Sequence, residues 1–134
     1  MVTDWSKTGI AVALVQKHCS CRAEGTVTCC KTGWKLCYAA SRFCLEAESR
    51  YSPVEGEALA VAWGCKKARY FLAGCQDMWV GVDHKPLLGL YAPEKALADI
   101  ENARLRRLVE KASEYRFKAF HIPGVRNLIA DGLS

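Results

Sequence analysis

The strongest constraint on the fold is a helix whose start and buried face are both visible in the sequence. Ser52, Pro53 and Glu55 form a typical helix N-terminus, with an N-cap serine, a proline in the first turn and a glutamate that completes a capping box. The expected helix runs to about Ala73 and ends at Gly74, which suits a helix C-terminus. A face of small residues, which predicts close packing against a sheet, recurs at helical spacing: Ala60, Val61, Gly64, Cys65 and Ala68.

The two glutamates at the start of this helix have different expected roles. Glu55 is explained by the capping box with Ser52. Glu57 has no such role and lies in line with the small residues, so it is expected to point toward the sheet. We therefore predict that Glu57 is the functional carboxylate of the pair.

Alternating and β-branched segments predict strands over 9–17, 34–43 and 116–122, with a short buried strand over 79–82 and an earlier strand that contains Asp4. Residues 18–33 show no period and are expected to form an extended hairpin loop. Helices are expected over 86–91 and 128–133, and over 102–115 with one apolar side formed by Leu105, Leu108, Val109 and Ala112. This order of elements predicts an α/β fold in which helices cover a mixed sheet.

The length and composition fit one domain spanning residues 1–134, with the 18–33 loop as an insertion. Of the 134 residues, 51% are hydrophobic and 25% are charged, and this balance argues against disorder. The apolar runs fall short of the roughly 18–20 residues needed to cross a bilayer. We therefore expect neither a membrane partner nor a secretory signal.

Positive charge is concentrated toward the C-terminal end. Residues 104–118 hold six basic side chains and two acidic ones, in a chain with a formal net charge of +5. Such a stripe suits a phosphate backbone, although a run of charges alone is more often a solvated helix face.

Three aspartates join Glu57 as candidate metal ligands. Asp4 precedes a turn-like segment, Asp83 ends the apolar run 79–82, and Asp131 opens the last expected helix. Each lies beside apolar sequence, where a lone charge is costly. Carboxylates gathered at strand ends suit a hard divalent cation such as Mg²⁺. Taken singly, Asp4 and Asp131 are better explained as turn or cap residues.

The eight cysteines divide into two groups. Four cysteines lie in the 18–33 loop: Cys19, Cys21, Cys29 and Cys30. They could form a four-thiolate Zn²⁺ site, form a disulfide or remain unligated thiols. Their spacing lacks the C-x₂₋₄-C pattern of structural zinc sites, which favours unligated thiols. The others are expected to be small core residues: Cys37, Cys44, Cys65 and Cys75.

Several blocks along nearly the whole chain resemble the ribonuclease H domain of gypsy-type LTR retrotransposon polyproteins. They are TDWSKTG at 3–9, SRF at 41–43, YSPVEGEALA at 51–60, DHKPLL at 83–88, HIPGVRN at 121–127 and ADGLS at 130–134. Each block is moderately specific, and the ordered set is highly specific. The 18–33 loop resembles an insertion found in some animal elements of this group.

The resemblance implies a type-I ribonuclease H fold, in which helices flank a five-stranded mixed sheet. It implies an endoribonuclease that cleaves the RNA strand of RNA–DNA hybrids during reverse transcription by two-metal-ion hydrolysis. The family's acidic positions fall on Asp4, Glu57, Asp83 and Asp131, which would hold two Mg²⁺ ions or Mn²⁺ in their place. The implied partners are the hybrid and the reverse transcriptase domain of the same polyprotein, in a cytoplasmic retroelement particle or in the nucleus.

Further residues have expected roles beside the acidic quartet. His121 precedes Asp131 by ten residues, the spacing of the family's mobile-loop histidine, and both a structural role and a role in proton transfer or product release are open for it. Candidate contacts to the hybrid backbone lie next to the catalytic positions or in the basic segment: Ser6, Tyr51, Ser52, His84 and Arg104.

Two rival functions stay open at this point. A catalytically weak or domesticated ribonuclease H-like module would bind nucleic acid without cutting it, although the intact acidic quartet argues against decay. The second rival function is that of another metal nuclease of the same fold superfamily. The Tyr51-Ser52-Pro53 helix start favours ribonuclease H over it.

Overall fold

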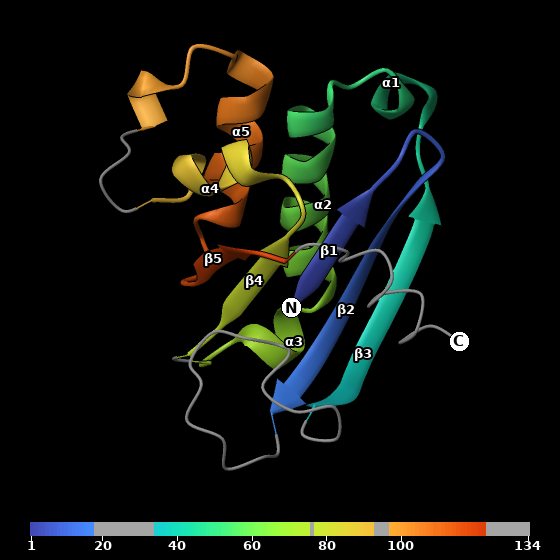
Figure 1. Ribbon diagram of the computed structural model, residues 1–134, viewed down its shortest axis with the longest axis vertical. Coiled ribbons are helices and arrows are strands. Elements are labelled where there is room, and N and C mark those ends of the chain that lie inside the picture. The colour runs from blue at the N-terminus through green and yellow to red at the C-terminus, as the bar shows by residue number, and fades with distance from the viewer. Residues whose placement is uncertain (18–33, 76, 93–96, 123–134) are drawn as a thin grey trace.

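Five strands form one mixed sheet in the computed structural model, which describes residues 1–17, 34–75, 77–92 and 97–122 (Figure 1). The order across the sheet is β3-β2-β1-β4-β5, with bounds β1 Val2–Trp5, β2 Gly9–Lys17, β3 Trp34–Phe43, β4 Trp79–Val82 and β5 Lys118–His121. β1 pairs antiparallel with β2 and parallel with β4, while β2 and β3 are antiparallel and β4 and β5 are parallel. The predicted bounds of β2, β3 and β4 are confirmed, and β5 is shorter than the predicted strand over 116–122.

The main helices lie against one face of this sheet. α2 Pro53–Lys67 packs on β1 and β2, and α5 Ala103–Ala112 packs on α2 (Figure 1). The shorter helices are α1 Glu46–Ser49, α3 Arg69–Leu72, α4 Lys85–Leu90 and the 3₁₀ helix η1 Leu97–Asp99. The predicted mixed sheet with flanking helices is confirmed. Among the described residues, no helix has the length and apolar character needed to span a bilayer.

α2 approaches the sheet through the face predicted from its small residues, which are all buried: Ala60, Val61, Gly64, Cys65 and Ala68. A Cβ atom added at Gly64 would lie 3.0 Å from Cγ2 of Val12, so a larger residue would push the helix away. One added at Gly56 would overlap the indole ring of Trp5. These two glycines therefore set the distance between α2 and the sheet.

The hydrophobic core lies between the sheet and the helical layer. α5 contributes the four side chains predicted for its apolar side, and they join β4 and α4 residues in one buried cluster that includes Val80, Val82 and Leu87. The helix begins at Asn102, whose side-chain oxygen accepts a hydrogen bond of 3.1 Å from the Leu105 N–H. α5 is shorter than the predicted 102–115 but uses the predicted face.

The helix predicted to run to about Ala73 is broken, which corrects the sequence analysis. α2 ends at Lys67, Ala68 adopts φ −90° and ψ 9°, and α3 begins at Arg69. The bend carries Phe71 to Tyr38 on β3, with ring centroids 5.5 Å apart. Neither glycine nor proline marks the break, so tertiary packing overrides the local helix propensity here.

Of the four cysteines expected to be small core residues, only Cys65 is fully buried. Cys65 is a core residue, and burial raises the pKa of its thiol to about 12. Cys44 is half-buried, and Cys37 and Cys75 are exposed, because Cys37 lies on the edge strand β3 and Cys75 follows the turn at Gly74. The 18–33 loop with its four cysteines lies outside the described residues, and so do Asp131 and the last predicted helix. The predictions for these regions stay predictions.

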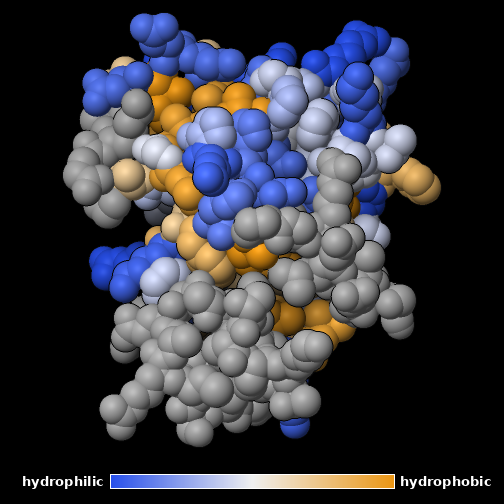
Figure 2. Space-filling view, viewed as in Figure 1, coloured by the Kyte–Doolittle hydropathy of each residue, from blue (hydrophilic) through white to orange (hydrophobic). Residues whose placement is uncertain are grey.

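A smaller apolar cluster occupies the face of the sheet opposite α2. It contains Val2, Ala13 and Ile122. Since Thr3 faces Gly64 of α2, strand alternation places Asp4 on the same face as Val2. In the view of Figure 1, β1 and β3 end in the upper half of the molecule, and Figure 2 shows hydrophilic residues predominating there, with apolar residues between them.

Gly56→Ala is expected to destabilise the protein, although alanine is the better helix former. An added Cβ would lie 2.1 Å from Cδ2 of Trp5, so we expect a cost in the upper part of the range of about 1–3 kcal/mol for overpacking, above the roughly 1 kcal/mol that alanine gains in helix propensity. Urea unfolding followed by circular dichroism measures the change. Gly89→Ala in α4 is the matched control, because an added Cβ there meets nothing within 4 Å, so its stability should be unchanged or higher. A Gly56→Ala chain as stable as the parent would contradict the packing described.

Candidate active site

Two predicted acidic residues lie at the same edge of the sheet. β1 and β4 run parallel with Val2 opposite Gly81. Asp4 and Asp83 each follow this pair by two residues, and Asp83 comes directly after the last residue of β4. The carboxyl ends of neighbouring parallel strands are where open α/β sheets bind their ligands. The sheet topology therefore brings Asp4 and Asp83 to a position suited to a binding site.

Glu57 adds a third carboxylate next to this edge. The glutamate is only 7% exposed, and the neighbouring Gly56 lies against Trp5, the residue that follows Asp4. This burial agrees with the inward position expected of Glu57, but the Glu55 side chain is also only 12% exposed, and the functional role of Glu57 stays a prediction.

His121 ends β5 beside the same edge. β5 is parallel to β4, with Val82 opposite His121. The imidazole Nε2 lies 3.7 Å from Oδ1 of Asp83. The histidine selected for its spacing from Asp131 thus lies beside a member of the acidic group.

The described carboxylates have the chemistry of a site for a hard cation, because all their donor atoms are oxygens. Within residues 1–17, 34–75, 77–92 and 97–122, however, no group of three or more His, Cys, Asp or Glu side chains is close enough together to hold a metal ion. Asp131, the fourth predicted ligand, lies outside these ranges. The role of the quartet as metal ligands stays a prediction.

Several predicted hybrid contacts have structural roles in addition. Ser6 forms the turn between β1 and β2, since its hydroxyl oxygen accepts hydrogen bonds from the N–H groups of Thr8 at 3.3 Å and Gly9 at 3.2 Å. Ser52 is the N-cap of α2, as predicted, and accepts a hydrogen bond of 3.5 Å from the Glu55 N–H. His84 is the N-cap residue of α4 and is half-buried. Ser6, Ser52 and His84 therefore all lie where elements begin or turn.

Arg104 joins the starts of α2 and α5. Its Nη1 lies 2.8 Å from Oε2 of Glu55, and its guanidinium carbon lies 4.6 Å from the ring centroid of Tyr51. The other Glu55 oxygen accepts a hydrogen bond of 2.8 Å from the Ser52 hydroxyl. The Arg104 guanidinium holds the pKa of Glu55 below its ordinary value, with Ser52 acting in the same direction. This pair could not be predicted from the sequence, because local spacing carries no signal for partners so far apart in the chain.

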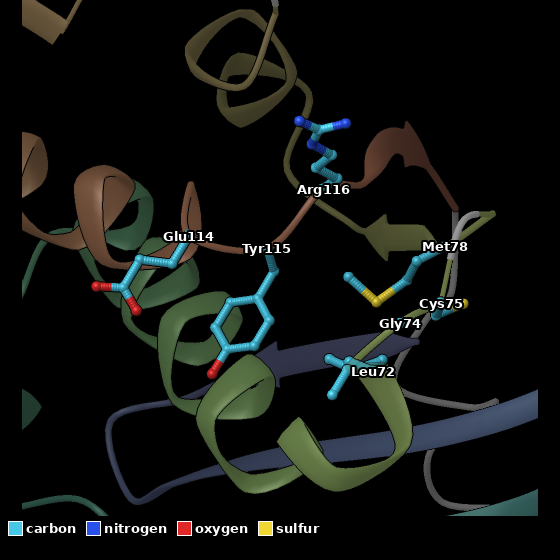
Figure 3. A pocket seen from close by; sticks show the side chains of 8 residues that line it. Leu72, Gly74, Cys75, Met78, Glu114, Tyr115 and Arg116 are labelled. Atoms are coloured by element: carbon cyan, nitrogen blue, oxygen red, sulfur yellow. The ribbon is translucent and has the colours of Figure 1, made fainter.

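A pocket of about 680 Å³ lies at the end of β4 opposite to Asp83 (Figure 3), and neither Asp4 nor Glu57 lines it. Its lining comes from α3 and the following turn, from the residue before β4, and from the α5–β5 connection: Leu72, Ala73, Gly74, Cys75, Met78, Glu114, Tyr115 and Arg116. None of the predicted site residues lines it. This pocket is therefore separate from the acidic edge.

The sequence is similar to known proteins over most of its length. Residues 1–115 match the family model described as an RNase H-like domain found in reverse transcriptase. Over 94 residues the chain is 38% identical to the retrovirus-related Pol polyprotein from transposon 297 and 32% identical to that from transposon gypsy, both of Drosophila melanogaster. Each match covers 70% of this chain, which spans only 8% and 9% of the two polyproteins.

The fold is similar to the crystal structure of RNase H1 from the halophilic archaeon Halobacterium salinarum NRC-1. The TM-score is 0.65, and the match covers 98% of this chain and 90% of that chain at 17% sequence identity. At this identity the likeness concerns the fold alone, and it confirms the predicted ribonuclease H fold.

Glu55→Gln is expected to weaken the acid-side dependence of stability on pH. Because the folded-state pKa of Glu55 lies below its ordinary value of 4.5, its contribution is fully present above pH 4.5 and is lost as the pH falls through the lowered pKa. The variant should unfold more easily than the parent near neutral pH and converge with it in acid. Thermal melts across this pH range measure the difference.

The control for this experiment is Glu110→Gln, which removes an exposed carboxylate from α5. The double variant Glu55→Gln/Arg104→Gln completes a double-mutant cycle. Strictly additive effects of the two substitutions would show that the carboxylate and the guanidinium are not coupled.

Proposed function

Because the chain belongs to the RNase H-like domains found in reverse transcriptase, within retrotransposon polyproteins, we propose that it is an endoribonuclease for RNA–DNA hybrids. It would cleave the RNA strand by metal-dependent hydrolysis. The observation that supports the proposal is the parallel pairing of β1 with β4, because Asp4 and Asp83 each lie two residues beyond the paired Val2 and Gly81 and buried Glu57 lies on α2. Carboxylates at this edge suit the hydrolysis of a phosphodiester.

The proposed cofactor is Mg²⁺, as two ions, with Mn²⁺ as a substitute. The residues that would hold them are Asp4, Glu57, Asp83 and Asp131. When bound, the ions supply a nucleophilic water at neutral pH and neutralise charge on the scissile phosphate. No serine or cysteine nucleophile is then required.

The protein's own residues would position the substrate and handle protons. Asp4 is held on β1, which has a hydrogen-bonded neighbour on each side, so its carboxylate has a fixed place. His121, whose Nε2 lies 3.7 Å from Oδ1 of Asp83, would transfer a proton during product departure.

The hybrid would lie across the acidic edge and contact the residues around it. The turn at Ser6, the start of α2 at Tyr51 and Ser52, and His84 before α4 border this edge, and Arg104 adds a cation beside Tyr51. These groups contact phosphates and carry no base information. Selection of the RNA strand would depend on its 2′-hydroxyl groups and on hybrid shape.

The domain would act within a larger protein. The matched polyproteins are far longer than this chain, and the matched family is found in reverse transcriptase. We therefore propose the reverse transcriptase domain of the same polyprotein as its partner, in a cytoplasmic retroelement particle or in the nucleus.

A second candidate is a nucleic-acid-binding module with weak or no nuclease activity. The observation that favours it is that the described residues hold no group of three side chains close enough for a metal. Such a module would bind hybrids in the presence of Mg²⁺ and leave the RNA intact. Hybrid, duplex RNA and duplex DNA substrates also distinguish ribonuclease H from another nuclease of the same fold.

Asp83→Asn tests the proposed activity. Loss of one carboxylate charge at the site is expected to slow hybrid cleavage by about a hundredfold or more, equivalent to roughly 3 kcal/mol of transition-state stabilisation. The measurement is the rate of cleavage of labelled RNA in a hybrid with Mg²⁺.

Asp77→Asn provides the matched control at the other end of β4. Asp77 is exposed and accepts a hydrogen bond of 3.1 Å from the Trp79 indole N–H, so its loss should leave the cleavage rate nearly unchanged. Equal cleavage by Asp83→Asn and the parent would rule out the acidic mechanism. Binding without any cleavage by the parent would support the second candidate.

A further inference from the structure

A strip of aromatic and basic side chains runs along the outer side of the helical layer, where α2 and α3 adjoin β3. Two contacts between β3 and the helices mark the two ends of this strip. Arg42 of β3 lies over the ring of Trp63 at 5.6 Å, and Tyr38 of β3 meets Phe71 at 5.5 Å. We name it the aromatic-basic strip, and its members are Tyr38, Arg42, Trp63, Lys67, Arg69, Tyr70 and Phe71.

The aromatic rings of the strip are open to solvent or flanked by cations. Tyr70 is 82% exposed and Phe71 is 53% exposed. Trp63 is half-buried, and the Nζ of Lys67 lies 6.0 Å from its ring on one helical turn. The guanidinium of Arg69 lies 5.1 Å from the ring of Tyr70. Cations next to aromatic faces are thus a repeated feature of this surface.

The strip is positively charged because the segments that form it contain no acidic residue. Residues 34–45 carry Lys35 and Arg42, residues 58–76 carry Lys66, Lys67 and Arg69, and neither segment has an Asp or Glu. One carboxylate reaches the strip from α1, where Glu48 binds Arg42 through two hydrogen bonds of 2.7 and 2.8 Å. The other cations of the strip have no carboxylate within 4 Å among the described residues.

Helix-end electrostatics explain only part of this arrangement. Lys66 and Lys67 complement the negative end of the α2 dipole, as cations at a helix C-terminus do. That effect gives no reason to leave Tyr70 and Phe71 exposed beside them. A ligand that carries both negative charge and flat apolar rings accounts for the cations and the aromatic rings together.

We propose that the aromatic-basic strip binds unpaired RNA or DNA. Phosphates would pair with Lys67 and Arg69, and bases would stack on Tyr70 and Phe71. A duplex keeps its bases stacked within itself and offers only phosphates, so the exposed rings favour a single strand. Lys67 follows Glu57 by ten helical residues, so the strip lies about 15 Å along α2 from that carboxylate. The strip is a binding surface separate from the acidic edge, and the proposal does not depend on cleavage.

The test is fluorescence anisotropy of labelled oligo(rU) and oligo(dT) with the 134-residue chain, without divalent metal, over a range of salt concentrations. Tyr70→Ala should weaken binding about tenfold through loss of base stacking. Lys67→Gln/Arg69→Gln should reduce the slope of log affinity against log salt by about 1.4, or roughly 0.7 for each cation. The two probes distinguish RNA from DNA as the preferred strand.

Matched controls remove the same chemistry from other places. Phe43→Ala deletes an exposed ring one residue beyond Arg42, where strand alternation turns the side chain to the other face. Arg116→Gln/Lys118→Gln removes two exposed cations at the start of β5. Both should bind the probes as the parent does, and thermal melts confirm that every variant is folded.

Three outcomes would overturn the proposal. Equal loss of affinity in the charge control would show that net charge alone drives binding. Unchanged affinity of Tyr70→Ala would exclude base stacking. Loss of association with a reverse transcriptase polypeptide, with oligonucleotide binding intact, would make the strip a protein-binding surface. Cleavage of blunt hybrids by these variants should match the parent, so a failure here is distinct from failure of the proposed nuclease activity.

Discussion

The close approach of α2 to β1 and β2 is the constraint on which the acidic edge depends. Gly64 and Gly56 let the helix lie where a side chain would meet Val12 or the Trp5 ring. The same spacing sets the position of Glu57, which α2 carries, relative to the strands. Under the proposed function, in which Glu57 acts with Asp4, this position matters because catalytic groups tolerate little misplacement.

Two ion pairs, Arg42–Glu48 and Arg104–Glu55, fix the places where the helical layer begins. Glu48 receives two hydrogen bonds from Arg42 and one of 2.8 Å from the Leu45 N–H, which holds α1 against the end of β3. Glu55 receives Arg104, which holds α5 against the start of α2. In each case a carboxylate in the first turn of a helix binds a cation from a different element.

Prediction from sequence succeeded where local pattern and tertiary packing agree. The strands 9–17 and 34–43, the N-cap at Ser52 and the apolar side of α5 follow from alternation, capping chemistry and helical period. It failed where packing acts against local preference, as at Ala68, and where a short helix lacks a usual cap. α1 follows Leu45, and its first turn is satisfied instead by Glu48, a residue inside the helix.

The candidate site was predictable to a different degree. The inward position of Glu57 followed from helical spacing, because Glu55 already had a capping partner. The parallel pairing of β1 with β4, after which Asp4 and Asp83 follow, could not be read from spacing within one strand. Likewise, the contacts of Arg42 with Trp63 and of Tyr38 with Phe71 join residues whose sequence separation carries no periodic signal.

The central position of β1 has a consequence for the order in which the domain assembles. β1 finds its first partner at once through the hairpin with β2, but its second partner is β4, whose Gly81 lies opposite Val2 only after most of the chain has been made. Such long-range parallel pairing forms slowly, because loop closure precedes any gain from contact. On a ribosome, the hairpin and α2 would exist before the acidic edge does. Until β4 pairs with it, the open edge of β1 is therefore the part of a nascent chain most exposed to pairing with strands of other chains.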